Sequence, residues 1–525
     1  MGRATHCGVF GALCVLMETF AFSGVQATPL DNPEAVIPPQ CYTKTEGAYN
    51  PCYICHQSHP KGSRVNTLDD GELQGSYNFS AFGVKNRWSN LHKAIDDKDR
   101  LPTDLEMLAY VREDNYQALY KELKTRRHYE WIALQNLGLG KRAFDAQGFA
   151  KDGSHWIAFN YKPVPSSFWP TNGSADDVMI RLPAVFRQTE KGVYSRQIYL
   201  LNLSLVEIAI KDLQSIQIPD TDEQRLGLDL DGNGKLNRTT VLERRGNYIG
   251  GAVNIALQRQ LYPTGTEFLH TLRYLNVTDR GNVVASRRLK EIRYTVKYKD
   301  LSEAALRYMY NIEKREKDQG RLPKYAWAKP VNRAGLNNKM GWNVQSWVED
   351  SAGALRLASY EENLFCMGCH TTIGTTIDQS FAFPRKLDGA QGWGYINLRG
   401  MRDAPSFNEQ DGEYLTYLKR VGGGDEFRQN QEMLIRWFDA SGRLKSHELK
   451  NTDVKTLVMP SSQRAMALNK AYWRIVQEQS FTFGRDTVLG TAEHVFKKID
   501  PENVPVLPVQ RRYHYDLRLN WNAVR

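Results

Sequence analysis

The feature that most constrains this chain is a five-residue pattern that occurs twice. Residues 52–56 (CYICH) and 366–370 (CMGCH) both have the form C-x-x-C-H, and 311 residues separate the last Cys of one pair from the first of the next. In this pattern two thiols one helical turn apart form thioethers to one edge of a porphyrin, and the following His gives the iron its proximal nitrogen. The chain is therefore predicted to hold two haem c groups. The predicted cofactor-binding residues are Cys52, Cys55, His56, Cys366, Cys369 and His370, with His56 and His370 as iron ligands.

Two other chemistries also use paired cysteines. Zinc sites normally bring two ligand pairs within about 20 residues of each other, which is far less than the spacing here. A redox dithiol gives no reason for a His after both copies. Cys41 lies outside both motifs. An odd Cys in an exported protein can be a buried inert thiol, pair with another chain, or carry a modification.

With these two pentapeptides, the sequence resembles the c-type cytochromes that carry two covalent haems. The resemblance is confined to residues 52–56 and 366–370. It implies maturation outside the cytoplasm and a redox partner protein or small-molecule electron donor or acceptor. The function implied first is relaying single electrons between redox partners. The alternative is a dihaem oxidoreductase, peroxidase- or oxygenase-like, with one open haem iron acting on peroxide, oxygen or a small substrate. No catalytic residue is assigned.

The first 27 residues are predicted to be a signal peptide. Arg3 precedes an apolar run over residues 7–17, which is too short to span a bilayer, and residues 25–27 (VQA) offer a cleavage site. A leucine precedes Cys14, where a lipoprotein signal has a small residue, so no lipid anchor is predicted. No later stretch reaches the ~18 apolar residues of a membrane span. We expect an exported protein, periplasmic or secreted.

The charge balance limits the class of partner. Lys and Arg number 69 against 59 Asp and Glu, which gives a net charge of +10 over 525 residues. Such an excess supports attraction to acidic protein surfaces but is too dilute to indicate nucleic-acid binding.

Three parts are predicted after the signal peptide. They are a first haem c domain (28–140), a mixed α/β middle domain without a haem of its own (141–348) and a second haem c domain (349–525). The expected fold class is mainly α with a mixed α/β middle block, multidomain and built around two haems. Hydrophobic periodicity predicts a helix over 105–111, a helical pattern that resumes at Tyr116 and ends in the region 138–140, helices over 199–213, 302–320 and 463–477, and strands over 267–275 and 291–298. His270, on an apolar strand face, is interpreted as a core residue.

The sixth position of each iron decides whether a haem is closed or open to a substrate. For the second haem we predict Met459, because the order of motif, Met-Pro and helix is that of the small class I cytochromes c. A core methionine is the alternative. His447 and His494 are rivals, and His494 lies in a short segment that is predicted to be helical with Thr491 as its cap. For the first haem we predict His92, which follows Trp88 in an aromatic stretch. Other candidates are His128, His155 and Met107, whereas His59 is too close to His56 to reach any but a neighbouring haem.

Residues 229–237 resemble the first nine positions of an EF-hand calcium loop. Oxygen ligands at every second residue suit a hard cation, and Gly234 falls where such a loop turns sharply. Position twelve is Thr240 instead of Glu, and Glu243, Asp222 or Glu223 could replace it. The alternative is an Asp/Asn/Gly turn without metal. The predicted Ca²⁺ ligands are Asp229, Asp231, Asn233, Lys235 through its carbonyl, and Asn237.

Overall fold

The computed structural model describes most of the chain after residue 30. The described residues are 1–2, 30–33, 35–57, 59, 62–64, 83–93, 95, 100–125, 132–319, 325–327, 335–371, 373–421, 430–500, 506–513 and 518–524. Within Asn32–Arg525 the chain forms one compact unit. The predicted signal peptide, apart from its first two residues, and His128 lie outside the described residues.

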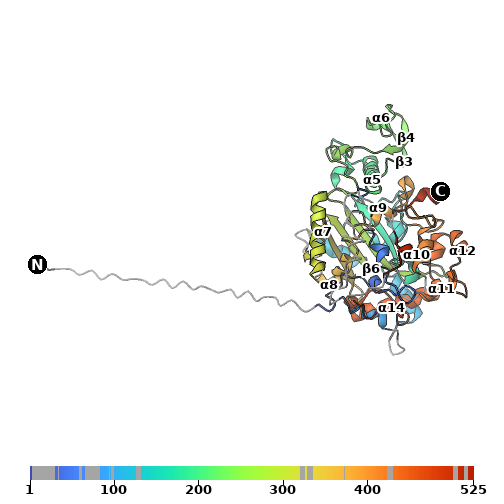
Figure 1. Ribbon diagram of the computed structural model, residues 1–525. Coiled ribbons are helices and arrows are strands. Elements are labelled where there is room, and N and C mark those ends of the chain that lie inside the picture. Colours follow the sequence, from blue (N-terminus) through green and yellow to red (C-terminus); the bar gives the residue numbers. More distant parts are fainter. Residues whose placement is uncertain are drawn as a thin grey trace. The chain divides into compact units, whose positions relative to one another are not determined.

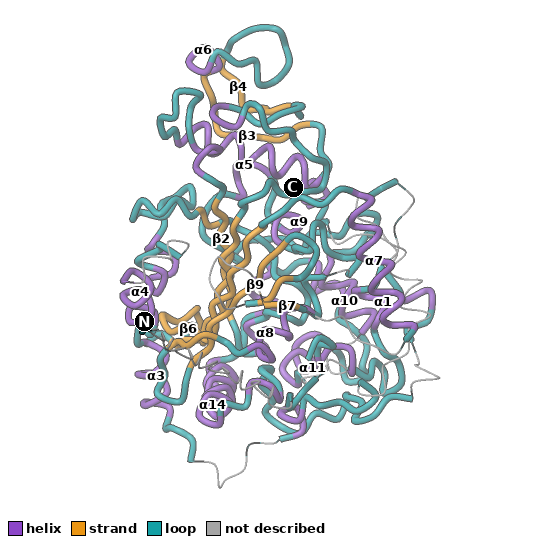
Figure 2. The backbone as a smooth tube through the Cα atoms, turned by 90° about the vertical axis from the view of Figure 1, so that its left-hand side faces the viewer, coloured by secondary structure: helices purple, strands orange, loops and turns teal. Residues whose placement is uncertain are grey.

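A large antiparallel sheet forms the centre of this unit (Figure 2). Eight strands of the described chain take part, and β10 (Leu355–Leu357) pairs with β9 at the side of the main path. The prediction of a mainly α fold is therefore wrong. The prediction failed because most of these strands are short or pair with strands that are distant in the sequence, so local hydrophobic periodicity did not reveal them. The main path runs β1 (Ile157–Ala158), β2 (Ala175–Arg181), β5 (Glu267–Val277), β6 (Val283–Lys297), β9 (Trp342–Glu349), β8 (Leu336–Asn337) and β7 (Ala326–Trp327).

The predicted helices over 105–111, 199–213, 302–320 and 463–477 and the predicted strand over 267–275 are confirmed, with ends shifted by at most three residues (Figure 1). The strand predicted over 291–298 is the second half of β6, which begins at Val283. The helix that begins at Tyr116 ends at Thr125, well before the predicted region 138–140. Ser302 begins α7 by accepting a hydrogen bond from Ala305 N, 3.2 Å away. The prediction of a helical segment after Thr491 is wrong, since residues 491–494 are irregular.

The longer helices are α3 (Asp104–Arg112), α4 (Tyr116–Thr125), α5 (Arg196–Lys211), α7 (Glu303–Asp318), α8 (Tyr360–Met367), α10 (Glu413–Val421) and α14 (Ser462–Glu478). The shorter ones are α1 (Cys52–Cys55), α6 (Glu223–Leu226), α9 (Ala382–Arg385), α11 (Gln431–Trp437), α12 (Ser446–Lys450) and α13 (Val454–Val458).

The two faces of the sheet differ in what covers them. Successive residues of a strand point to opposite faces. On β6, Ile292 and Tyr294 point into an apolar cluster that α4 closes with Leu119 and Leu123. The opposite face lines an internal cavity, so the polar residues of the predicted strand 291–298 do not form a solvent-exposed face. The residues on this cavity face are Asp176 and Val178 of β2, Phe268, His270 and Leu272 of β5, Glu291, Arg293 and Thr295 of β6, and Trp342 and Val344 of β9.

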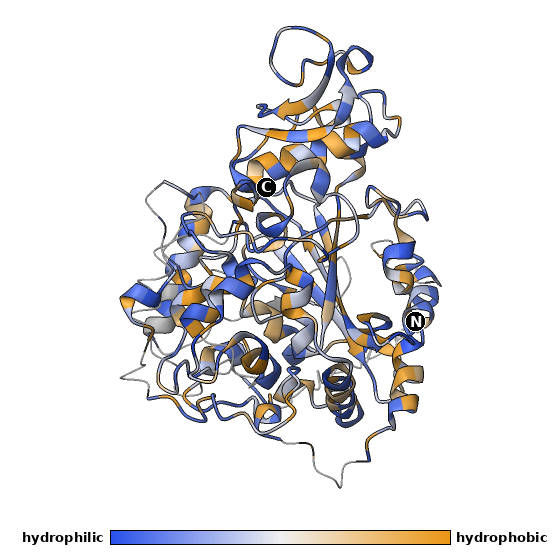
Figure 3. Ribbon diagram, turned by 90° about the vertical axis from the view of Figure 1, so that its right-hand side faces the viewer, coloured by the Kyte–Doolittle hydropathy of each residue, from blue (hydrophilic) through white to orange (hydrophobic). Residues whose placement is uncertain are grey.

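A second, smaller element packs at one end of the unit. Strands β3 (Ser215–Asp222) and β4 (Arg238–Glu243) form an antiparallel pair beside α5. Helix α5 is almost entirely buried, and Figure 3 shows how hydrophobic and hydrophilic residues are distributed over the fold. Within the described residues, no helix is both long enough and apolar enough to cross a membrane.

Candidate functional site

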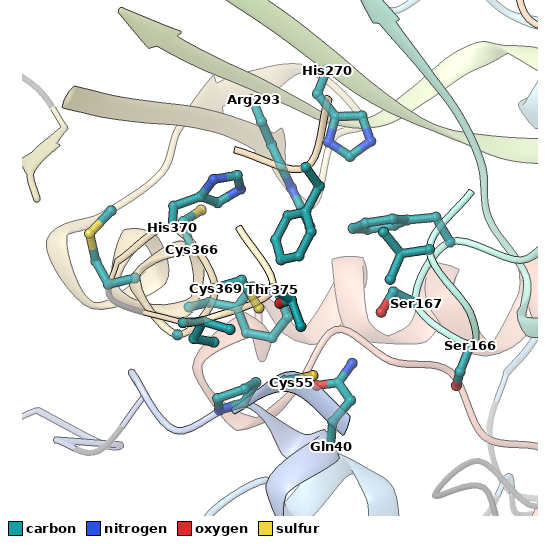
Figure 4. A pocket seen from close by; sticks show the side chains of 18 of the residues that line it. Gln40, Cys55, Ser166, Ser167, His270, Arg293, Cys366, Cys369, His370 and Thr375 are labelled. Carbon is teal, nitrogen blue, oxygen red and sulfur yellow. The ribbon is translucent and has the colours of Figure 1, made fainter. Parts of the chain in front are cut away.

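Both C-x-x-C-H motifs line the same cavity, which measures about 360 Å³. The cavity lies between the sheet and the loops and short helices that carry the motifs. Figure 4 shows Cys55 and Gln40 on one side of this space and Cys366, Cys369 and His370 on another, with His270 and Arg293 reaching in from the strands. Residues that are 311 positions apart in the sequence therefore form one site.

The first motif is the single-turn helix α1, held by a buried asparagine. Asn50 Oδ1 accepts a hydrogen bond from Cys52 N at 2.9 Å, and Asn50 Nδ2 donates to the carbonyl of Cys41. His56 N donates to Cys52 O at 2.9 Å and closes the turn. The two thiols thus stand one turn apart, as haem attachment requires.

The chain that follows the first motif packs directly on the loop that follows the second. His59 Nε2 lies 2.8 Å from the carbonyl oxygen of Gly374, and Arg64 Nη1 donates to the same oxygen at 3.0 Å. These contacts fix the two motif loops relative to each other.

The second motif begins in the last turn of α8. Ser359 and Glu362 form a capping box at the start of this helix, and Arg356 holds the Glu362 carboxylate with bonds of 2.8 and 2.9 Å. The helix ends at Gly368, where an added Cβ would lie 2.6 Å from Val36 O. Glycine at position 368 therefore lets the cavity-lining segment 36–38 approach the motif.

The His370 imidazole is held in the tautomer that a metal ligand needs. Its Nδ1 lies 2.8 Å from the carbonyl oxygen of Gln379, and because a carbonyl only accepts, Nδ1 carries the proton. The Nε2 lone pair is left for a metal. Burial lowers the pKa of His370 to about 4, so the ring is neutral at neutral pH.

A strained turn presents the Gln379 carbonyl. Asp378 and Gln379 both have left-handed backbone conformations, with φ of 49° and 57°. Such residues persist only where their surroundings determine the conformation. Here the Asp378 carboxylate accepts a hydrogen bond from Tyr262 N at 2.9 Å and pairs with the buried Lys297.

The thiols and imidazoles border a space and do not converge on one point. Within the part of the chain that the structure describes, the group of His, Cys, Asp or Glu side chains close enough to hold a metal ion is Glu223, Asp229 and Asp231, far from either motif. Burial raises the pKa of Cys366, and it raises the pKa of Cys369 to about 11, so these thiols are protonated at neutral pH. This geometry gives no support to a four-ligand zinc site.

Several buried polar atoms on the cavity wall have no hydrogen-bond partner among the described residues. Leaving such an atom unsatisfied costs about 1–3 kcal/mol. The space therefore fits a group with polar substituents that the chain itself does not supply. These atoms are Thr375 Oγ1, both side-chain polar atoms of Gln379, Gln40 Oε1 and Tyr472 OH.

The residues predicted as sixth iron ligands do not line the cavity. Met459 directly follows α13 and packs against the cluster around Leu275. His92 ends a short 3₁₀ helix, Ser89–His92, near residues 492 and 497. The described residues that line the cavity include neither of them, and they also exclude Met107, His155, His447 and His494.

Sequence reasoning misses His270 as a site residue. Its place on an apolar strand face favours a core residue, yet it lines the cavity and its side chain is 19% exposed. The alternating pattern of residues 267–275 places it on one strand face correctly. The pattern does not reveal whether that strand face packs against other side chains or borders a cavity.

The predicted calcium loop connects α6 to β4. Carboxylate oxygens of Glu223, Asp229 and Asp231 lie within 4.8 Å of one another. Glu223 is fully buried and accepts hydrogen bonds from Leu230 N and from Asn237 N, the latter at 2.8 Å. Asn233 Oδ1 accepts from Lys235 N at 2.8 Å. Of the three suggested replacements for a position-twelve Glu, Glu223 is the one in this cluster, and calcium binding stays a prediction.

Comparison with known proteins identifies the family to which the chain belongs. A family model described as "-like lipoprotein" matches residues 25–454, which include both motifs. The chain belongs to this lipoprotein family. An uncharacterized lipoprotein of Aquifex aeolicus (strain VF5) is 29% identical over 87% of this chain and 86% of the relative. No solved structure matches.

Family membership corrects the assignment suggested by the motifs. The resemblance to c-type cytochromes is wrong as a family assignment, because it rests on the two pentapeptides alone, whereas the lipoprotein family matches most of the chain. The two functions it implied, a dihaem electron carrier and a dihaem oxidoreductase with one open iron, are overturned with it. Membership in the lipoprotein family agrees with the predicted export.

Proposed function

We propose that this member of the lipoprotein family covalently binds two haem groups in the cavity that its two motifs share. The observation that carries the proposal is that two C-x-x-C-H sequences from distant parts of the chain line one internal space without forming a metal cluster among the described residues. A porphyrin needs such a space beside each thiol pair, whereas zinc needs the ligands to meet.

Each motif contributes the same three groups. Each of the two thiols would add its S–H bond across a vinyl group of haem, which would form two carbon–sulfur bonds without a leaving group. His56 and His370 would supply the imidazole nitrogens for iron, and the Gln379 carbonyl keeps His370 in the required tautomer. When bound, haem supplies an iron porphyrin centre whose properties the cavity wall sets.

Intact-mass measurement tests the proposal in a host that can attach haem. We expect the mature wild-type chain to carry the mass of two haems. The double variants C52A/C55A and C366A/C369A are each expected to carry one. Cys41→Ala is the matched control, because Cys41 lines the same cavity but belongs to neither motif, and it should retain both haems. A colourless wild-type protein of unmodified mass would contradict the proposal.

For location, we propose a periplasmic or secreted protein. The predicted signal peptide over residues 1–27 supports export. The names of the family and of the relative describe lipoproteins, whereas Leu13 before Cys14 is unfavourable for lipid attachment. Labelling cells with a fatty-acid analogue should leave the mature chain unlabelled. Label that disappears in Cys14→Ala would instead place the protein on a membrane.

A further inference from the structure

We propose that His270 would be a further iron ligand, besides His370, for the haem that the second motif would hold. The inference rests on the proposed function, since it assigns the coordination of a haem that the second motif would hold. It replaces the sequence-based choice of Met459, which packs outside the cavity.

His270 is placed on the cavity by strand register. It lies on β5, opposite Val178 of β2 and Arg293 of β6. All three residues line the cavity, and His270 points from the strand into that space (Figure 4). Among the described lining residues, the imidazoles are those of His56, His270 and His370, so His270 is the one outside a C-x-x-C-H motif.

A buried carboxylate orients the His270 ring. His270 Nε2 lies 3.2 Å from Asp176 Oδ2, and the same carboxylate accepts a hydrogen bond from Tyr161 OH. Asp176 is 6% exposed. With its Nε2–H donated to Asp176, the ring keeps Nδ1 as a lone-pair donor. Hydrogen bonding of one ring nitrogen to a carboxylate is the usual way in which a ligating His is fixed in orientation.

Aromatic packing restricts the ring further. Phe168 meets His270 edge to face, with ring centroids 4.9 Å apart and planes at 87°. Two different contacts, one polar and one apolar, therefore hold the imidazole. A ring held in this way loses little conformational entropy when it binds a metal.

The neighbours of His270 connect it to the second motif. Arg293, its cross-strand partner, lies 5.8 Å from the ring centroid of Phe365, the residue before Cys366. Arg293 also pairs with Glu291 at 2.9 Å, and Arg485 donates to the same carboxylate at 2.9 Å. These contacts seat the β5–β6 part of the wall against the end of α8, so His270 belongs to the His370 side of the cavity.

Electron paramagnetic resonance of the ferric protein tests the assignment. We expect His270→Gly to keep both haems by intact mass and to convert the centre held by the second motif from low spin to high spin, which reduces the low-spin signal. Added imidazole should restore the low-spin signal, because it can occupy the position that the side chain vacates. His92→Gln and Met459→Leu are the matched controls, and neither should change the spectrum.

Asp176 acts as a positioning residue, and its substitution should give a spectrum different from that of His270→Gly. Asp176→Asn should keep both haems and the low-spin state of the centre that His270 binds but shift the g-values of that centre, since the imidazole would lose an anionic partner. If His270→Gly does not fold, His270→Met provides the same test, with one centre expected to show a sulfur-ligated spectrum.

Two results would overturn the inference in distinguishable ways. A His270→Gly protein with two haems and an unchanged low-spin signal would remove His270 as a ligand and leave the proposed function intact. A wild-type chain without haem would overturn the proposed function and, with it, the ligand assignment.

Discussion

His370 Nδ1 lies 2.8 Å from the backbone carbonyl of Gln379, nine residues further along the chain. The second motif is therefore more than a pattern of thiols and an imidazole, because the fold sets the protonation of its ring. Both the turn that presents this carbonyl and the glycine that ends α8 can be tested without any cofactor.

Asp378→Ala should destabilise the protein strongly. The change removes the acceptor for Tyr262 N and the buried partner of Lys297, which is 1% exposed and, among the described residues, keeps only the more exposed Asp300, 3.4 Å away. Breaking a buried pair on one side costs about 3–5 kcal/mol. Urea unfolding measures this free energy. Asp279→Ala is the control, since Asp279 is 96% exposed in its pair with Arg112, and a loss below about 1 kcal/mol is expected there. Equal effects of the two changes would contradict the role of Asp378.

Gly368→Ala should destabilise the protein by about 1–3 kcal/mol, the usual cost of overpacking. The new methyl group would lie 2.6 Å from Val36 O and 2.8 Å from Pro38 Cδ. Gly246→Ala is the matched control, because nothing lies within 4 Å of the place that its methyl group would take. Thermal unfolding of the two variants compares them. A fully tolerated Gly368→Ala would show that segment 36–38 does not need this close approach.

Lys290 should make stability depend on pH. Burial lowers its pKa to about 7, although Glu291, Glu349 and Asp486 act in the opposite direction. Between pH 7 and the ordinary lysine value the unfolded chain binds the extra proton, so this group makes stability rise with pH, by about 1.4 kcal/mol per unit.

Lys290→Met removes that dependence and checks the sign. Relative to the wild type, the variant should gain stability as the pH is lowered from about 10 to about 7, measured by urea unfolding at each pH. The hydrogen bond from Lys290 Nζ to Gly173 O, 2.7 Å long, is also lost, but that loss gives an offset that does not vary with pH. Parallel pH profiles of the two proteins would show that Lys290 titrates normally.

Removal of calcium should lower the melting temperature without releasing haem. A ligand at about 100 times its Kd stabilises the folded state by about 2.7 kcal/mol, and exported proteins meet calcium concentrations high enough to fill a weak site. Glu223→Gln should abolish the effect of a chelator, since Glu223 belongs to the acidic cluster. Melting curves with and without chelator measure it, and identical curves for the wild type would contradict calcium binding.

Local sequence determined the individual elements and the chemistry of the motifs. Helices α5 and α14 and strands β5 and β6 follow from periodicity, because amphipathic or alternating patterns are set by neighbours along the chain. The C-x-x-C-H spacing likewise places two thiols and an imidazole on one turn whatever surrounds them.

Only the tertiary structure decided that the two motifs share a cavity and that His270 belongs to it. Alternation in 267–275 and 291–298 separates two faces of each strand but does not say what covers either face. The pairing of β5 and β6 with β2 and β9, together with the contact of His59 with Gly374, decides this. Contacts across such long separations in sequence depend on the packing of the whole chain, because burial of apolar area and satisfaction of buried polar groups are properties of the folded unit.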